Sequence, residues 1–168
     1  MTISVGEKLP GATLLKMGPD GPEPVELDSL TKGRKVVIFA LPGAYTGTCT
    51  TSHVPSFIRT RKDFAAKGVD EVICISVNDP FVMGAWGEAT GASDAGITML
   101  GDTDASFTKA MGRAFSAPPA GLLDRSKRYA LYAEDGVIKV LHEEESPGVC
   151  DTSGGESMLK AIGAEADG

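Results

Sequence analysis

Residues 36–49 read VVIFALPGAYTGTC, and this stretch decides the fold. Its six leading apolar residues predict a buried strand, and Pro42-Gly43 predicts a turn directly after it. Beyond the turn, apolar residues recur at three- and four-residue spacing, which predicts a helix. Cys49 therefore lies in the first turn of that helix, where unpaired backbone N–H groups and the positive end of the helix dipole favour a thiolate. This position indicates a reactive thiol rather than a packing cysteine.

The composition favours one globular domain, residues 1–168, with a substantial core, because 42% of the 168 residues are hydrophobic. A net charge of −7 argues against nucleic acid as a partner. We expect no secretory signal and no membrane span. Three widely spaced cysteines do not suggest a secreted disulfide scaffold, so the expected location is a reducing cytoplasm.

Predicted strands and helices alternate along the chain, which is typical of an α/β architecture. We expect an N-terminal hairpin between residues 12 and 27, strands at 35–41, 71–77 and 97–101, and helices at 48–67, 80–89 and 102–113. A second hairpin turns at Asp135-Gly136, and a capping box at 153–156 predicts a C-terminal helix. This order is that of a thioredoxin-like fold, with a central mixed sheet flanked by helices and an N-terminal hairpin extension.

The residues around Cys49 suit chemistry at a peroxide O–O bond. Such a reaction needs an attacking thiolate, a cation that holds its charge, donors for the oxygens and exclusion of water. Pro42 can shield the sulfur, and the Thr46 hydroxyl can reach the sulfur and a bound oxygen. Arg128, remote in sequence, can supply a cation with bidentate geometry.

Pro42, Thr46 and Cys49 together meet the pattern Pro-x-x-x-Thr-x-x-Cys, and in this the chain resembles the peroxiredoxin family. Residues 36–57 and 77–83 look like its Prx5 (type II) branch, and residues 128–130 look like its arginine-bearing strand. The resemblance covers nearly the whole chain. It implies a thioredoxin fold and a thiol peroxidase that reduces hydrogen peroxide and alkyl hydroperoxides, with no cofactor and no metal.

The resemblance also implies roles for individual residues. Cys49 would attack the peroxide and become a sulfenic acid, Pro42 would shield the site, and Arg128 would stabilise the thiolate and polarise the substrate. Substrate contacts would come from Thr46, Gly47, Thr48, Arg128 and His53. His53 is more simply a hydrogen-bonded structural histidine than a general base. Thioredoxin, or glutathione with glutaredoxin, would supply electrons, and a homodimer is expected.

Two further cysteines leave the recycling of the sulfenic acid open. Cys150 precedes the C-terminal helix in a flexible-looking segment, where some animal members of this branch carry a resolving cysteine. Cys74 lies within an apolar strand, where a small buried hydrophobe is the simpler interpretation. Resolution by Cys150, by Cys74 or by an external thiol remain as alternatives.

Other chemistries are excluded by spacing. The glycine- and threonine-rich residues 43–50 lack the lysine of a phosphate-binding loop. No Cys-x-x-Cys pair and no zinc pattern occurs. Residues 143–145, three glutamates, are expected to form an exposed acidic turn. The rival hypothesis is a non-enzymatic redox sensor or binding module on the same fold, which would not sustain turnover.

Overall fold

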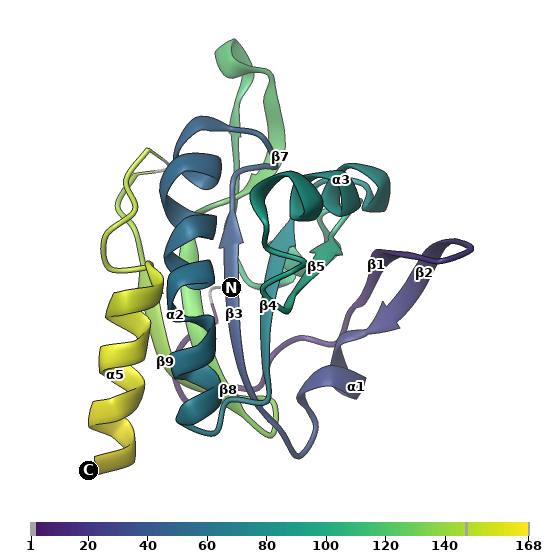
Figure 1. Ribbon diagram of the computed structural model, residues 1–168. Coiled ribbons are helices and arrows are strands. Elements are labelled where there is room, and N and C mark those ends of the chain that lie inside the picture. Colours follow the sequence, from purple (N-terminus) through teal and green to yellow (C-terminus); the bar gives the residue numbers. More distant parts are fainter. Residues whose placement is uncertain (1–2, 147, 168) are drawn as a thin grey trace.

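A seven-stranded mixed sheet forms the centre of the protein, shown in Figure 1 as a computed structural model that describes residues 3–146 and 148–167. Its strand order is β2-β1-β5-β4-β3-β8-β9. The strands are β1 (Thr13–Gly18), β2 (Gly21–Glu26), β3 (Lys35–Leu41), β4 (Glu71–Ser76), β5 (Ile97–Gly101), β8 (Tyr129–Glu134) and β9 (Val137–Glu143). Strands β3, β4 and β5 are parallel, and the other pairings are antiparallel. The thioredoxin-like α/β fold with its N-terminal hairpin is thus confirmed.

Helices cover both faces of this sheet. The helices α2 (Val54–Ala66), α3 (Pro80–Thr90) and α5 (Gly155–Asp167) contribute to one apolar cluster, and α2 and α5 lie side by side (Figure 1). The shorter α1 (Leu27–Thr31) and α4 (Ser106–Ala110) contribute to the cluster on the opposite face. Strand β3 supplies Val37 and Phe39 to the first cluster and Val36 and Ile38 to the second. Burial on both faces explains why its sequence is apolar without alternation.

Several predicted elements differ from the observed ones. The predicted helix at 102–113 shrinks to α4, because the Asp102 carboxylate accepts hydrogen bonds from the backbone N–H groups of Phe107 and Thr108 and holds residues 102–105 in a turn. Helix α1 has no counterpart in the predicted pattern. The predicted capping box is wrong in its hydrogen bonds: the Ser153 hydroxyl donates to Glu144, and Glu156 pairs with Arg59.

Residues 114–126, for which the pattern predicts no element, form a second, two-stranded sheet. Its strands are β6 (Ala114–Ala117) and β7 (Leu122–Ser126), joined by the 3-10 turn η2 (Pro118–Ala120). Figure 1 shows this hairpin projecting beyond the end of β3. None of the helices among the described residues is long and apolar enough to cross a membrane.

Candidate active site

Cys49 begins a π-helical turn, Cys49–His53, that leads directly into α2. The Val54 N–H donates to the Cys49 carbonyl five residues earlier, which is the wider π spacing. Pro55 follows in the first turn of α2, where its missing N–H is tolerated. The sequence pattern predicts a regular first helical turn at Cys49, whereas the structure has the wider π turn there. Cys49 and His53, four residues apart, both point inward and are 0% exposed.

Arg128 reaches Cys49 from the start of β8, across 79 residues of sequence. Its Nη2 donates to Cys49 Sγ at 3.1 Å, and its Nη1 lies 2.8 Å from His53 Nδ1. The side chain is only 2% exposed, so these contacts are made away from solvent. Strand β8 pairs with β3, and this pairing brings Arg128 to the carboxyl end of β3, where the Cys49 turn begins. A fixed guanidinium therefore places positive charge directly beside the sulfur.

His53 is neutral, and its tautomer follows from its partners. Burial, and secondly the positive charge of Arg128, lower the pKa of His53 from 6.5 to about 3. Its Nε2 lies 3.0 Å from the Ser153 carbonyl, which can only accept, so Nε2 carries the proton. A guanidinium can only donate, so the lone pair of Nδ1 is engaged by Arg128. With both ring nitrogens occupied, His53 links Arg128 to Ser153 and has no free atom for general-base work.

The turn before Cys49 is held by groups that sequence reasoning missed. Arg125 of β7 donates to the Pro42 carbonyl at 3.1 Å, and Asn78 accepts from the Ala44 N–H at 3.0 Å. Asn78 follows β4 closely, at the sheet edge where parallel strands end and ligand sites usually lie. That edge position was the available sequence signal. Nothing comparable marked Arg125, because no strand was predicted around it.

Above this turn lies a shallow depression lined by Pro42, Thr46, Gly47, Thr48, Leu122, Arg128 and Gly148. Arg128 connects it to Cys49, because this residue lines the depression and its Nη2 contacts Sγ. Thr46 donates its hydroxyl proton to the Gly43 carbonyl at 2.7 Å, so toward a substrate this oxygen would act as a hydrogen-bond acceptor. Leu122 and Gly148 are lining residues that the sequence did not suggest. His53 is not among the residues that line the depression; it is buried and contacts Arg128, so its contact with substrate stays a prediction.

The other two cysteines lie in contrasting surroundings. Cys150 is partly buried in a second depression, beside Thr51 and Ser52 of the π turn. Burial raises the pKa of its thiol and Glu144 adds to this, while Arg128 acts in the opposite direction. Cys74 lies inside β4 at 0% exposure, and burial, followed by the proximity of Cys49, raises its pKa well above the usual value. All three cysteines are free thiols.

The described residues contain no group of three His, Cys, Asp or Glu side chains placed to hold a metal ion. The site itself presents a buried thiol beside a fixed guanidinium, next to a small depression on the surface.

Comparison with known proteins agrees with this geometry. The Redoxin family profile matches residues 4–159. Peroxiredoxin-2E-2, chloroplastic, of Oryza sativa is 50% identical over 165 residues, which cover 96% of this chain and 73% of the rice protein. Peroxiredoxin-2F, mitochondrial, of Arabidopsis thaliana is 47% identical over 136 residues, 81% of this chain and 67% of that protein. The crystal structure of reduced Prx3 from Vibrio vulnificus in complex with hydrogen peroxide superposes with a TM-score of 0.89 at 43% identity, covering 96% of this chain and 99% of that one.

Proposed function

Since this chain belongs to the peroxiredoxin family, as a type II, Prx5-like member and hence a thiol-dependent peroxidase, we propose that Cys49 is its peroxidatic cysteine. The observation that carries the assignment is the 3.1 Å hydrogen bond from Arg128 Nη2 to Cys49 Sγ in a water-poor site. Cys74 is enclosed within β4 at 0% exposure, and Cys150 lies in a separate depression.

The reaction begins when the Cys49 thiolate attacks the terminal oxygen of a hydroperoxide bound in the depression. An S–O bond forms as the O–O bond breaks, so sulfur is oxidised to a sulfenic acid and the peroxide is reduced. The leaving alkoxide or hydroxide takes up a proton to become alcohol or water. Arg128 stabilises negative charge first on sulfur and then on the departing oxygen. Thr46, with backbone N–H groups at Gly47 and Thr48, orients the substrate, and Pro42 limits access of water.

Replacement of Cys49 tests this assignment. Cys49→Ser should abolish steady-state consumption of hydrogen peroxide in the presence of a regenerating thiol, because serine is a far weaker nucleophile. Cys74→Ser is the matched control and should retain turnover. Peroxide consumption by Cys49→Ser at the wild-type rate would contradict the assignment. Sustained turnover also separates the enzyme from a redox sensor on the same fold, which reacts once and stops.

For recycling, we propose that Cys150 attacks the Cys49 sulfenic acid and that an external thiol then reduces the disulfide. Supporting this, Cys150 is partly exposed and borders the turn that carries Cys49, whereas Cys74 is enclosed in β4. A disulfide requires Cα atoms within about 7 Å, so formation of the Cys49–Cys150 bond depends on how closely the Cys150 segment approaches the π turn. Thioredoxin, or glutathione with glutaredoxin, is proposed as the reductant.

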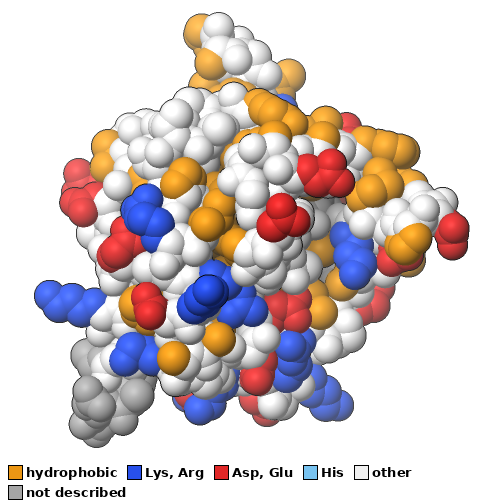
Figure 2. Space-filling view, in the orientation of Figure 1, with side chains coloured by type: hydrophobic (Ala, Val, Ile, Leu, Met, Phe, Trp, Pro, Cys, Tyr) orange, Lys and Arg blue, Asp and Glu red, His pale blue; other side chains and the backbone are white. Residues whose placement is uncertain are grey.

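A homodimer is also proposed. Phe81, at 63% exposure, and Tyr45, at 56%, are large apolar side chains on the surface at α3 and the Cys49 turn. Figure 2 shows hydrophobic side chains gathered over the α3 region in the upper right of the view. Sedimentation equilibrium of the wild type and of Phe81→Glu tests this, since a charge at that position should dissociate the dimer. A cytoplasmic location stays a prediction from the sequence.

A further inference from the structure

Glu144, directly after β9, holds the segment that follows Cys150. Its Oε2 accepts hydrogen bonds from the Asp151 N–H at 2.7 Å, the Ser153 N–H at 2.7 Å and the Ser153 hydroxyl at 2.6 Å. Its Oε1 accepts from the Thr152 hydroxyl at 3.3 Å. The expectation that residues 143–145 form a simple exposed acidic turn is therefore wrong for Glu144. Three consecutive residues converge on one carboxylate.

Beyond Ser153 the contacts continue to the reactive sulfur. The carbonyl of Ser153 faces His53 Nε2 at 3.0 Å, His53 Nδ1 faces Arg128 Nη1 at 2.8 Å, and Arg128 Nη2 donates to Cys49 Sγ at 3.1 Å. The two histidine contacts are mutually dependent, because the proton on Nε2 leaves Nδ1 bare for Arg128. Rings of Phe39 and Phe57 pack on the imidazole at centroid distances of 5.1 and 5.6 Å.

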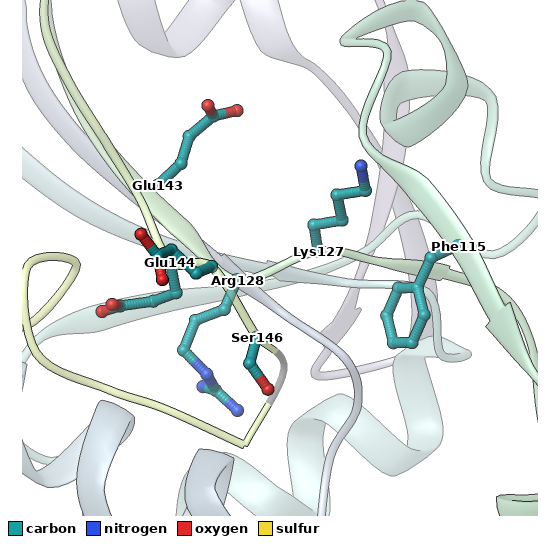
Figure 3. A pocket seen from close by; sticks show the side chains of 7 residues that line it. Phe115, Lys127, Arg128, Glu143, Glu144 and Ser146 are labelled. Atoms are coloured by element: carbon teal, nitrogen blue, oxygen red, sulfur yellow. The ribbon is translucent and has the colours of Figure 1, made fainter.

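No direct contact between the Glu144 side chain and Arg128 is needed for this connection. Figure 3 shows both residues lining one pocket, with the Arg128 side chain extending away from the carboxylate of Glu143. Glu143 is engaged elsewhere, in an ion pair with Arg113, and Glu145 is exposed. Although burial alone would raise the pKa of Glu144, hydrogen bonds from Ser153, Asp151 and Thr152 outweigh it and lower the pKa, which keeps the acceptor ionised.

We propose that Glu144 is a positioning residue for the peroxidatic site: it fixes the Ser153 carbonyl, which fixes the His53 tautomer, which holds Arg128 against Cys49. The proposal rests on Cys49 being the peroxidatic residue. Cys150 lies between two anchors of the same segment, since the Thr48 hydroxyl also donates to the Gly148 carbonyl at 3.0 Å.

The test compares Glu144→Ala with Glu145→Ala, its exposed neighbour, in the full chain. The rate constant for the first reaction of Cys49 with hydrogen peroxide is measured in single turnover. Trp86, the sole tryptophan, serves as the fluorescence probe because its Nε1 donates to Thr50 beside Cys49. We expect Glu144→Ala to lower this rate constant about tenfold, because small misplacements of catalytic groups reduce rates by this factor or more. Glu145→Ala should match the wild type.

A second measurement reads the His53 tautomer by nitrogen-15 NMR of the imidazoles, with His53→Gln to assign the signals of the two histidines. The wild type should show a single tautomer protonated at Nε2, and Glu144→Ala should lose that fixed pattern. Glu144→Gln retains an acceptor oxygen for Asp151 and Ser153. It should therefore restore most of the rate constant for hydrogen peroxide and the single His53 tautomer. A general loss of packing would not be rescued in this way.

Equal rate constants for Glu144→Ala and Glu145→Ala, or an unchanged His53 tautomer in Glu144→Ala, would overturn the proposal. If Glu144→Ala does not fold, Ser153→Ala removes one donor to the same carboxylate, and its rate constant must fall below that of Glu145→Ala. Absence of any peroxide reaction in the wild type would instead contradict the role of Cys49. The NMR measurement needs no peroxide, so the two failures remain distinguishable.

Discussion

Arg128 lies with Nη2 3.1 Å from Cys49 Sγ, although 79 positions separate the two residues in the sequence. The contact depends on the planar guanidinium, because its other terminal nitrogen is simultaneously engaged with His53 Nδ1 at 2.8 Å. Both the cation and the thiol are buried, so water does not screen the interaction.

Arg128→Lys should lower the second-order rate constant for hydrogen peroxide by about 100-fold, since an ammonium group lacks the planar pair of terminal nitrogens that contacts sulfur and imidazole separately. Competition kinetics against a peroxidase of known rate measures the change. Lys127→Gln removes a charge from the exposed neighbouring residue and should change the rate little. If Arg128→Lys reacted as fast as Lys127→Gln, the guanidinium geometry would not matter.

His53 should make the protein less stable in mild acid. Its folded pKa of about 3 lies below the value of 6.5 for a free histidine, so below pH 6.5 the unfolded chain binds a proton that the folded protein does not. The free energy of unfolding should therefore decrease as pH falls from 6.5 towards 3, with about 2 kcal/mol lost between pH 7 and pH 5.

Urea denaturation at pH 7 and pH 5 measures this loss. His53→Gln removes the titrating group and should flatten this part of the profile. A slope in His53→Gln as steep as in the wild type would show that other groups cause the acid sensitivity.

Oxidation of the reduced protein with one equivalent of hydrogen peroxide should cause loss of two hydrogens, which is the mass signature of a Cys49–Cys150 disulfide. Cys150→Ser should instead gain one oxygen, because its sulfenic acid has no partner within the chain. Intact-mass spectrometry before addition of any thiol gives the result, and peptide mapping identifies the linked cysteines. A disulfide that persists in Cys150→Ser would transfer the resolving role to Cys74. A gain of one oxygen in the wild type would indicate an external thiol.

Gly155→Ala should destabilise the protein by about 1–3 kcal/mol, because a Cβ there would overlap the Ser56 carbonyl and the Thr60 hydroxyl of α2. Gly163, on the same helix, has only the flexible end of Lys67 near its Cβ position. Gly163→Ala should therefore stabilise the protein by about 0.5–1 kcal/mol through helix propensity. Thermal denaturation of the two variants and the wild type measures these changes in stability. Destabilisation of equal size at the two positions would mean that the close approach of α5 to α2 is not the cause.

Local sequence was sufficient to predict those elements whose residue pattern directly reflects their burial or their turn geometry. The six-residue apolar run of β3 identifies a strand buried on both faces, and Asp135-Gly136 supplies the positive φ angles of 50° and 76° that its hairpin turn requires. Asp79 directly precedes the predicted helix at 80–89 and caps α3, accepting from the Val82 N–H at 2.8 Å. The order of these elements predicts the thioredoxin-like fold. The resemblance of residues 42–49 to the peroxiredoxin motif predicts the family.

Only the tertiary structure decided which residues contact one another at the site. The π turn is defined by its hydrogen-bond spacing, which no single residue type in this stretch predicts. Strands β6 and β7 are short and partly exposed, and their sequences show no clear apolar alternation. Glu144 looked like one of three surface glutamates, because the donors that engage it lie seven to nine residues further along and meet it only after the chain turns back from β9. Local patterns determine which residues become strands and helices. Contacts between distant residues depend on how those elements pack, and these contacts set the charge, tautomer and exposure of each group at the site.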